Sequence, residues 1–388
     1  MHQLENYWKE LDDPKDLLLA LRKKAWEHFQ EIGLPRPKQE AFQYLPLQKI
    51  TFPKLAQRQS LPVHKSGLVF INGFFEEALS TIPKGLICLP LDAALRSYGL
   101  FLQNRLKRTL KEEKDPFALL NGALQSKGVF LYAPPKWTSE TPLQIHQIFT
   151  TSDLSLPRIE ISLGKSASLS LIQTIQGTEL HVNQTIDAVL DEGARLSFTD
   201  QQELPKTAQF FQTIRATLKR DSFFRTLTLT KGAAIARTSI KVQLAEENAE
   251  TLLQGLSQLT GELQSHTHIT VEHQAPHTRS RQHFKTLLKE KSRSSFEGKI
   301  YVHPIAQKTE AYQLNNNLLL SDEASAHAKP NLEIFADDVK ASHGATIAQL
   351  NEEELFYLRS RGLSLDEAKE WLIQGFAAEI LNQRASYA

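Results

Sequence analysis

Cysteine is almost absent from this sequence, because Cys88 is the only one among 388 residues. A single cysteine excludes an internal disulfide, and it excludes a cysteine-rich cluster site built by this chain alone. Cys88 lies in the apolar run Gly-Leu-Ile-Cys-Leu-Pro-Leu over residues 85–91. A free cysteine in such a run is commonly a small buried side chain, so we expect a structural role rather than a reactive thiol.

An excess of charge and long apolar runs are also missing. The formal net charge of +1 argues against a nucleic-acid partner, which would need a strongly basic face or tail. No apolar run approaches the length of a membrane span, and the first residues, Met-His-Gln-Leu-Glu-Asn, lack the features of a secretory signal. These observations predict a cytoplasmic protein without a membrane partner.

Two motifs of common enzymes do not occur. There is no Gly-x-x-x-x-Gly-Lys-Ser/Thr loop for ATP phosphates and no Gly-x-Ser-x-Gly elbow for a serine nucleophile. If an ATPase takes part in the function, it must therefore be another subunit.

The N-terminal third is typical of helices. Apolar residues recur at helical spacing over residues 4–32, with a start signal at Asp13-Pro14 and a stop at Gly33. The other elements expected here are a buried strand from Gly67 that ends in an Asn-Gly hairpin turn at Gly73, and helices over 91–110 and 115–125, the latter capped by Asp115.

From about residue 129 to 335 the pattern changes to short alternating runs of five or six residues, with no room for a helix between them. Such strands form a sandwich, a barrel or a β-solenoid. About 200 residues of strands exceed the usual sandwich and favour stacked turns of a solenoid. The irregular repeat interval leaves the choice open. Three segments, at Gly164, Gly193 and Gly232, each place a turn, an alanine and an aliphatic residue before a strand.

Histidines are concentrated in one part of this region. Five of the thirteen fall in a short stretch: His266, His268, His273, His277 and His283. His266 and His268 are two apart in a predicted strand and share a face, which a metal pair would need. No cysteine or aspartate lies nearby to complete a site, so we interpret these histidines as ordinary strand residues.

The segment from Gln307 to Gly362 contains the strongest candidate site. A strand over Leu332–Phe335, a turn at Asp337-Asp338 and a second extended piece present His343 as an exposed imidazole, followed by Gly344. Glu333, Asp337 and Asp338 could form a carboxylate cluster, but adjacent aspartates are more typical of a turn.

Two short helices are predicted at the C-terminus. Asn351 caps the first and Gly362 ends it, while Ser364 and Glu367 form a capping box for the second. Helices in this place can cap the last turns of a solenoid.

The segment from Gln307 to Gly362 resembles the SufB/SufD family of iron–sulfur cluster assembly proteins. The family pattern appears as Gln-Lys-Thr at 307, Asn-Leu-Leu-Leu-Ser at 317, Lys-Pro-Asn-Leu-Glu-Ile at 329, Asp-Asp-Val-Lys-Ala-Ser-His-Gly-Ala-Thr at 337 and Leu-Phe-Tyr-Leu-Arg-Ser-Arg-Gly at 355. It departs at Ala341, where many members carry cysteine. A partial match covers Gly33–Leu47, with Phe42 and Leu45 in place of the family's tryptophan and threonine, and Lys38 at its lysine position.

The resemblance implies a mainly β fold, a right-handed parallel β-helix with helical ends. We expect an N-terminal, mostly helical region over 1–128, a β-helix core over 129–350 and a C-terminal helical region over 351–388. In its low number of cysteines the chain resembles the SufD branch of the family rather than the SufB branch. The family implies a non-catalytic scaffold that pairs with SufB and docks the ATPase SufC.

The resemblance also implies the site residues. His343 would be a ligand of a nascent iron–sulfur cluster shared with SufB, and no cofactor would be intrinsic to the chain. With Ala341 at the cysteine position, the sulfur ligands would come from the partner. The segment implied for SufC docking comprises Leu355, Phe356, Tyr357, Arg359, Arg361 and Gly362.

Two alternatives remain at this point. One is a β-helix enzyme that processes polysaccharide, although the aromatic residues expected for its cleft are few. The other is a homodimeric scaffold that works without SufB.

Overall fold

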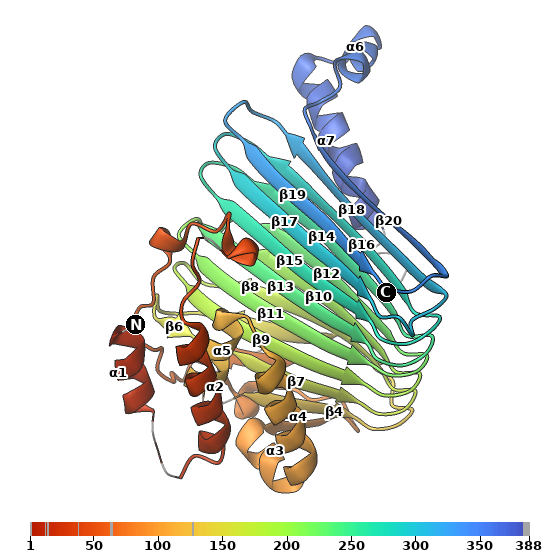
Figure 1. Ribbon diagram of the computed structural model, residues 1–388. Coiled ribbons are helices and arrows are strands. Elements are labelled where there is room, and N and C mark those ends of the chain that lie inside the picture. The colour runs from red at the N-terminus through yellow and green to blue at the C-terminus, as the bar shows by residue number, and fades with distance from the viewer. Residues whose placement is uncertain are drawn as a thin grey trace.

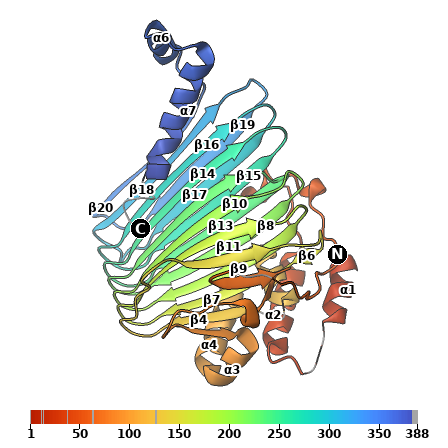
Figure 2. The ribbon, with the colours of Figure 1, turned by 180° about the vertical axis from the view of Figure 1, so that it is seen from behind.

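Two sheets form the body of the molecule, and the chain winds between them. The computed structural model describes residues 2–382 except residues 12, 14, 38, 63, 64, 126 and 127. From β7 onward successive strands alternate between the sheets, and neighbours within each sheet run parallel. The result is a β-solenoid of about eight turns with helices at both ends (Figures 1 and 2), which confirms the predicted fold class.

Each sheet follows the order of the solenoid turns. Sheet A contains, in spatial order, β19 (Ser325–Ile334), β17 (Arg293–Val302), β15 (Gln264–His273), β13 (Ile235–Leu244), β11 (Gln209–Leu218), β9 (His181–Leu190), β7 (Arg158–Leu163), β4 (Val129–Ala133) and β3 (Ile87–Pro90), with β6 (Leu154–Ser155) beside β9. Sheet B contains β2 (Phe74–Phe75), β1 (Leu68–Ile71), β5 (Leu143–Ile148), β8 (Ser168–Gln176), β10 (Arg195–Glu203), β12 (Phe223–Lys231), β14 (Glu250–Leu259), β16 (Arg279–Leu288), β18 (Thr309–Leu319) and β20 (Val339–Ala348).

The strands are longer than the five or six residues predicted. In β10 the strand continues through Asp200 and Gln202, which are buried inside the solenoid. The Asp200 carboxylate accepts hydrogen bonds from the side-chain amides of Gln173, Gln202 and Gln212 at 2.7–2.9 Å. Burial raises the pKa of Asp200, and the three donors compensate for its lost hydration. Polar residues can continue the strand here because their side chains form hydrogen bonds with one another inside the solenoid.

The predicted turn signals are confirmed. The left-handed backbone conformation occurs at Gly193 (φ 67°) and Gly232 (φ 88°), just before β10 and β13. At Gly232 a Cβ would lie 1.8 Å from the Leu204 carbonyl oxygen, so only glycine fits there.

The N-terminal region packs on one end of the solenoid. Its helices are α1 (His2–Glu10), α2 (Leu19–Ile32), α3 (Leu91–Ser97), α4 (Gly99–Glu112) and α5 (Pro116–Leu124), with 3₁₀ turns at Glu40–Phe42, Leu47–Lys49 and Glu77–Leu79. The predicted hairpin is confirmed as β1 and β2, and the Asp115 side chain accepts from the Phe117 N–H at the start of α5.

Two predicted helix boundaries in this region are wrong. The second helix starts at Leu19 rather than at Asp13-Pro14, because the side chains of Asp13 and Asp16 first hold turns by accepting from backbone N–H groups. Pro14 itself lies outside the described residues. The helix expected over 91–110 is divided into α3 and α4 at Tyr98.

Buried ion pairs fix these helices to sheet A. Arg105 of α4 donates to the Ile161 carbonyl and the Ser162 hydroxyl of β7 at 2.9 and 2.8 Å. Arg215 of β11 pairs with Asp187 of β9 and with Glu113, which follows α4. Although burial opposes it, the neighbouring arginines hold the pKa of Asp187 well below its usual range.

The C-terminal helices are α6 (Glu352–Ser360) and α7 (Leu365–Leu381), and their predicted caps are confirmed. The later part of α7 packs on the outer face of sheet B, where Ala377 and Ile380 join a leucine cluster. Lys285 of β16 donates to the Phe376 carbonyl at 3.0 Å and pairs with Glu379. In Figure 1, α6 lies beyond the last strands, at the end of the solenoid opposite α1–α3.

Candidate functional site

The open end of the solenoid is formed by β19 and β20, the last strands of their sheets. Each has a hydrogen-bonded neighbour on one side only among the described strands. The turn predicted at Asp337-Asp338 joins them. The strand predicted over Leu332–Phe335 is the end of the longer β19, which stops at Ile334, so that Phe335 lies just beyond it. Several apolar side chains are exposed here, including Phe335 (55%) and Ile347 (47%). An exposed ten-residue edge with apolar side chains is a surface on which another chain can add a strand.

His343 is an exposed residue of this end strand. Its register partner on β18 is Gln313, and the partner of Gln313 on β16 is Gln282. Both glutamines are buried, at 3% and 2% exposure. Because register partners share a face in a parallel sheet, His343 belongs to the inner face, at the mouth of the interior. Ala341 and Ala345, two residues before and after it, share that face.

The predicted docking segment lies on α6 and the turn that follows it. Phe356 and Tyr357 are exposed by 74% and 57%, and Arg359, Arg361 and Gly362 are exposed as well. Leu355 differs, because it is 4% exposed and therefore buried within the chain. Trp371 of α7 adds a further exposed aromatic side chain at 64%. This pair of helices thus presents large apolar side chains to solvent, which is typical of an interaction surface.

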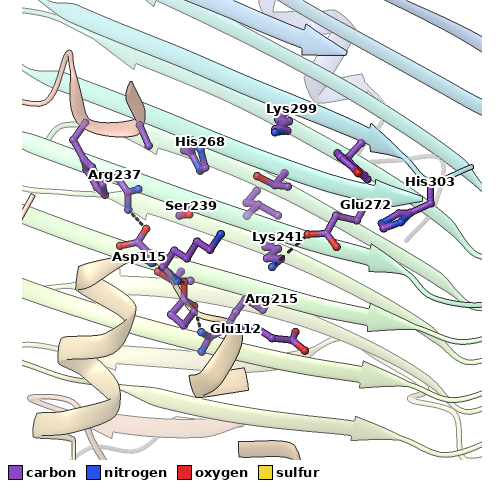
Figure 3. A pocket seen from close by; sticks show the side chains of 18 residues that line it. Glu112, Asp115, Arg215, Arg237, Ser239, Lys241, His268, Glu272, Lys299 and His303 are labelled. Atoms are coloured by element: carbon purple, nitrogen blue, oxygen red, sulfur yellow. Dashed lines mark hydrogen bonds and ion pairs between the residues drawn. The ribbon is translucent and has the colours of Figure 1, made fainter. Parts of the chain in front are cut away.

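The outer face of sheet A contains a cavity of about 500 Å³, roofed by the segment around Phe42 and the turn between α4 and α5. Figure 3 shows its charged wall. Asp115 pairs with Arg237 at 2.6 Å, Glu272 with Lys241 at 3.4 Å, and Lys299 with Glu333 at 2.7 Å.

These pairs engage six of the charged side chains in and beside the cavity. Two aromatic side chains, Phe42 and Tyr301, line the cavity, and Phe42 is already covered by Arg237, whose guanidinium carbon lies 4.8 Å from its ring. The cavity therefore gives no specific support to the polysaccharide-processing alternative.

The concentrated histidines occupy different places. His266 is hydrogen-bonded to Ser295 and Gln264 on the outer face of sheet A. His273 is hydrogen-bonded to Thr278 and Ser280 inside the solenoid. Burial, with the nearby Arg237, lowers the pKa of His266 to about 3, and burial alone lowers that of His273 to about 3. Across the described residues no group of three or more His, Cys, Asp or Glu side chains is placed to hold a metal ion.

Cys88 is half-buried in β3 and packs against the core. Burial raises the pKa of its thiol to about 12, which fits the structural role expected for it. Among the described residues, no helix combines the length and apolar character that a bilayer requires.

One contact at the open end was not anticipated from the sequence. The N-terminal segment crosses the outer face of sheet A as far as β19, where the Tyr44 ring stacks on His327 at 4.0 Å and Glu40 pairs with Lys329. This segment is the one with the partial N-terminal family pattern, of which Lys38 lies outside the described residues. The pattern marked the segment, but no sequence signal gives its contact with β19.

Comparison with family models identifies the chain. Residues 147–376 match the model described as SUF system FeS cluster assembly, SufBD core domain, and residues 9–145 match the SufBD protein N-terminal region. The chain belongs to the SufB/SufD family of iron–sulfur cluster assembly proteins. The SufBD core match covers most of the solenoid together with α6 and the greater part of α7.

Individual relatives agree with the assignment. An iron–sulfur cluster assembly SufBD family protein of Synechocystis is 29% identical, over 95% of this chain and 87% of the relative. The iron–sulfur cluster assembly protein SufD of Escherichia coli is 28% identical, over 92% and 88%. A SufBD family protein of Pyrococcus horikoshii is 29% identical, over 81% and 70%. The chain is thus a SufD homologue of the iron–sulfur cluster assembly family.

Proposed function

We propose that this SufBD-family chain is a non-catalytic scaffold subunit, which pairs with a SufB chain at its open end and docks a SufC-type ATPase on α6 and α7. The long unpaired edge of β19 and β20 is the observation that carries the proposal, because backbone N–H and C=O groups there can pair with another sheet. The assembling cluster is cargo held at the seam between the chains.

His343 is the residue of this chain that we assign to the cargo. Imidazole is a suitable iron ligand, and mixed histidine and cysteine ligation of clusters occurs. The side chain is exposed at the mouth of the interior, where an added chain would approach it. Since residue 341 is alanine, thiolates must come from the partner.

Co-expression with candidate SufB and SufC chains tests the cargo role. We expect His343→Ala to leave the complex intact and to lower the iron and sulfide bound per complex. His277→Asn is the matched control, because His277 is an exposed turn histidine at φ 59°, where asparagine is well tolerated. Unchanged cluster content in the His343 variant would remove this residue from the proposal.

The docking role is tested on α6. Phe356→Ser should reduce recovery of the ATPase about 30-fold, the loss typical of an aromatic anchor worth about 2 kcal/mol. The fold should not suffer, because Phe356 is 74% exposed. Glu353→Gln on the same helix is the control, and full ATPase recovery by the Phe356 variant would refute this docking surface. Deleting residues 351–388 should abolish recovery too, but it also uncovers the leucines beneath α7.

A second copy of this chain could occupy the same edge. Sizing the purified protein alone and then with SufB separates the two assemblies. A dimer that persists and excludes SufB would favour the homodimeric scaffold.

A further inference from the structure

Side chains at one register position of neighbouring sheet B strands form a column in the interior of the solenoid. Beneath His343 the first two members of this column are the side-chain amides of Gln313 and Gln282. Gln282, Gln313 and His343 occupy the same register position on β16, β18 and β20. Neighbouring strands are about 4.8 Å apart, so each side chain in the column can reach the next. Below Gln282 the column continues with Leu253, a core residue. The polar part of the column therefore begins two strands before the open end.

The hydrogen bond between the glutamines has a direction. Gln313 Nε2 donates to Gln282 Oε1 at 2.7 Å. The Gln313 Oε1 atom is buried and has no hydrogen-bond partner among the described residues. A buried acceptor without a donor is destabilising, because the hydrogen bonds that it made with water are not replaced. The free acceptor is therefore on β18, and the neighbouring strand β20 has His343 at the same register position.

Gly298 on the opposite sheet makes room for this arrangement. A Cβ at residue 298 would lie 1.9 Å from Gln313 Nε2 and 2.7 Å from its Cδ. The Gln313 amide therefore crosses the interior and lies over the Gly298 backbone. With Gln282 on one side and Gly298 on the other, its position is fixed before any partner binds.

We propose that Gln313 is the positioning residue for His343: the two are not hydrogen-bonded in this structure, but an inward rotation of the exposed His343 side chain lets Gln313 Oε1 accept a hydrogen bond from one ring N–H of the imidazole. This inference rests on the proposed function, in which His343 is a ligand of the cargo. A neutral imidazole has one N–H and one free lone pair. When Oε1 holds the N–H, the lone pair of the other nitrogen is presented at the mouth of the solenoid. Metal-binding histidines commonly have such a partner, and losing it typically lowers metal affinity 10- to 100-fold.

The first test measures the imidazole itself. Nitrogen-15 spectra of the histidine rings in the full-length chain, at about pH 8.5, report which ring nitrogen holds the proton. His343→Ala identifies the relevant signals. Gln313→Leu removes the acceptor and should shift the His343 nitrogens towards those of a solvent-exposed histidine. Gln313→Glu keeps an acceptor and should retain the wild-type tautomer.

A second variant tests the same contact between Gln313 and His343 without changing Gln282 or Gln313. Gly298→Ala displaces the Gln313 side chain and should shift the His343 signals in the same direction as Gln313→Leu. The control is Gln243→Leu, which removes a half-buried glutamine amide from β13, bonded to Thr217 and remote from the column. Circular dichroism checks that each variant is folded.

The second test uses the co-purified complex and separates the two proposals. We expect cluster content at limiting iron to fall about 10- to 100-fold in Gln313→Leu and to recover in Gln313→Glu. Wild-type His343 signals in both folded Gln313→Leu and Gly298→Ala proteins would overturn the positioning role. If those signals shift but His343→Ala keeps its cluster, the positioning role stands and the ligand role of His343 fails.

Discussion

Single residues in this protein take their roles from the strand register. His266 and His343 are both strand histidines, yet one is buried with two hydrogen-bond partners and the other is exposed at the last turn. His273 is also buried, with a pKa lowered to about 3. Because an unfolded histidine has a pKa near 6.5, folding keeps His266 and His273 neutral over a pH range in which the unfolded chain protonates them.

The first prediction concerns stability in acid. Between pH 6.5 and about 3 the unfolded state binds more protons at His266 and His273. The stability that these groups contribute is therefore complete above pH 6.5 and decreases as the pH falls. At pH 5 the loss is about 2 kcal/mol for each histidine, at 1.36 kcal/mol per pH unit. Urea unfolding at pH 7.5 and pH 5 measures it.

A matched pair of variants assigns this loss. His273→Gln removes the titrating group and should flatten the pH dependence by about the contribution of one histidine. His277→Gln, at an exposed turn, should keep the wild-type pH dependence. Identical slopes for His273→Gln and wild type would show that this histidine does not cause the loss.

At the scale of elements, α7 connects the exposed α6 to the solenoid. Its contact with sheet B depends on Ile380, which is fully buried, and on Lys285, which is 4% exposed and bonded to the helix near its C-terminal end. The Lys285 ammonium also lies 4.3 Å from the centre of the Phe376 ring. A force applied to α6 by a bound partner would therefore reach β14 and β16 through this contact.

The second prediction tests that connection. Ile380→Ala leaves a cavity in the contact and should destabilise the docked helix by about 2–5 kcal/mol. Hydrogen exchange should become faster in α7 while the strands from β8 to β16 keep their protection. Leu381→Ala is the control, because Leu381 is 39% exposed. Equal protection of α7 in wild type and Ile380→Ala would contradict the inferred role of this contact.

At the scale of the molecule, the two ends of the solenoid differ. At the N-terminal end the outermost strands, β2 and β3, have only two and four residues and pair antiparallel with β1 and β4, and β3 is in contact with α3. At the other end β19 and β20 each have one free edge among the described strands, and the inner face of β20, with His343 and Ile347, is exposed. The long strand edges among the described residues are thus at the C-terminal end of the solenoid.

The third prediction concerns that open end. Ile347→Lys places a charge on the exposed edge, a change that natural proteins use to prevent strand pairing. We expect the variant to remain folded and to lose its complex with SufB in size-exclusion chromatography. Ile305→Lys, at a 66% exposed turn residue before β18, is the matched control. Normal complex formation by Ile347→Lys would argue that pairing uses another surface.

The sequence by itself determined the features that depend on local chemistry or on a long ordered pattern. Turn residues before strands and the caps of α5, α6 and α7 were predicted because each acts over a few residues, and the family pattern around His343 because it is matched in order over a long segment. Only the tertiary structure decided the burial of Asp200, the length of the strands and the contact of Tyr44 with β19. It also decided that Gln282 and Gln313 lie beneath His343. Gln282 and Gln313 are 31 positions apart and meet through parallel register, and a single sequence does not encode register in any local signal.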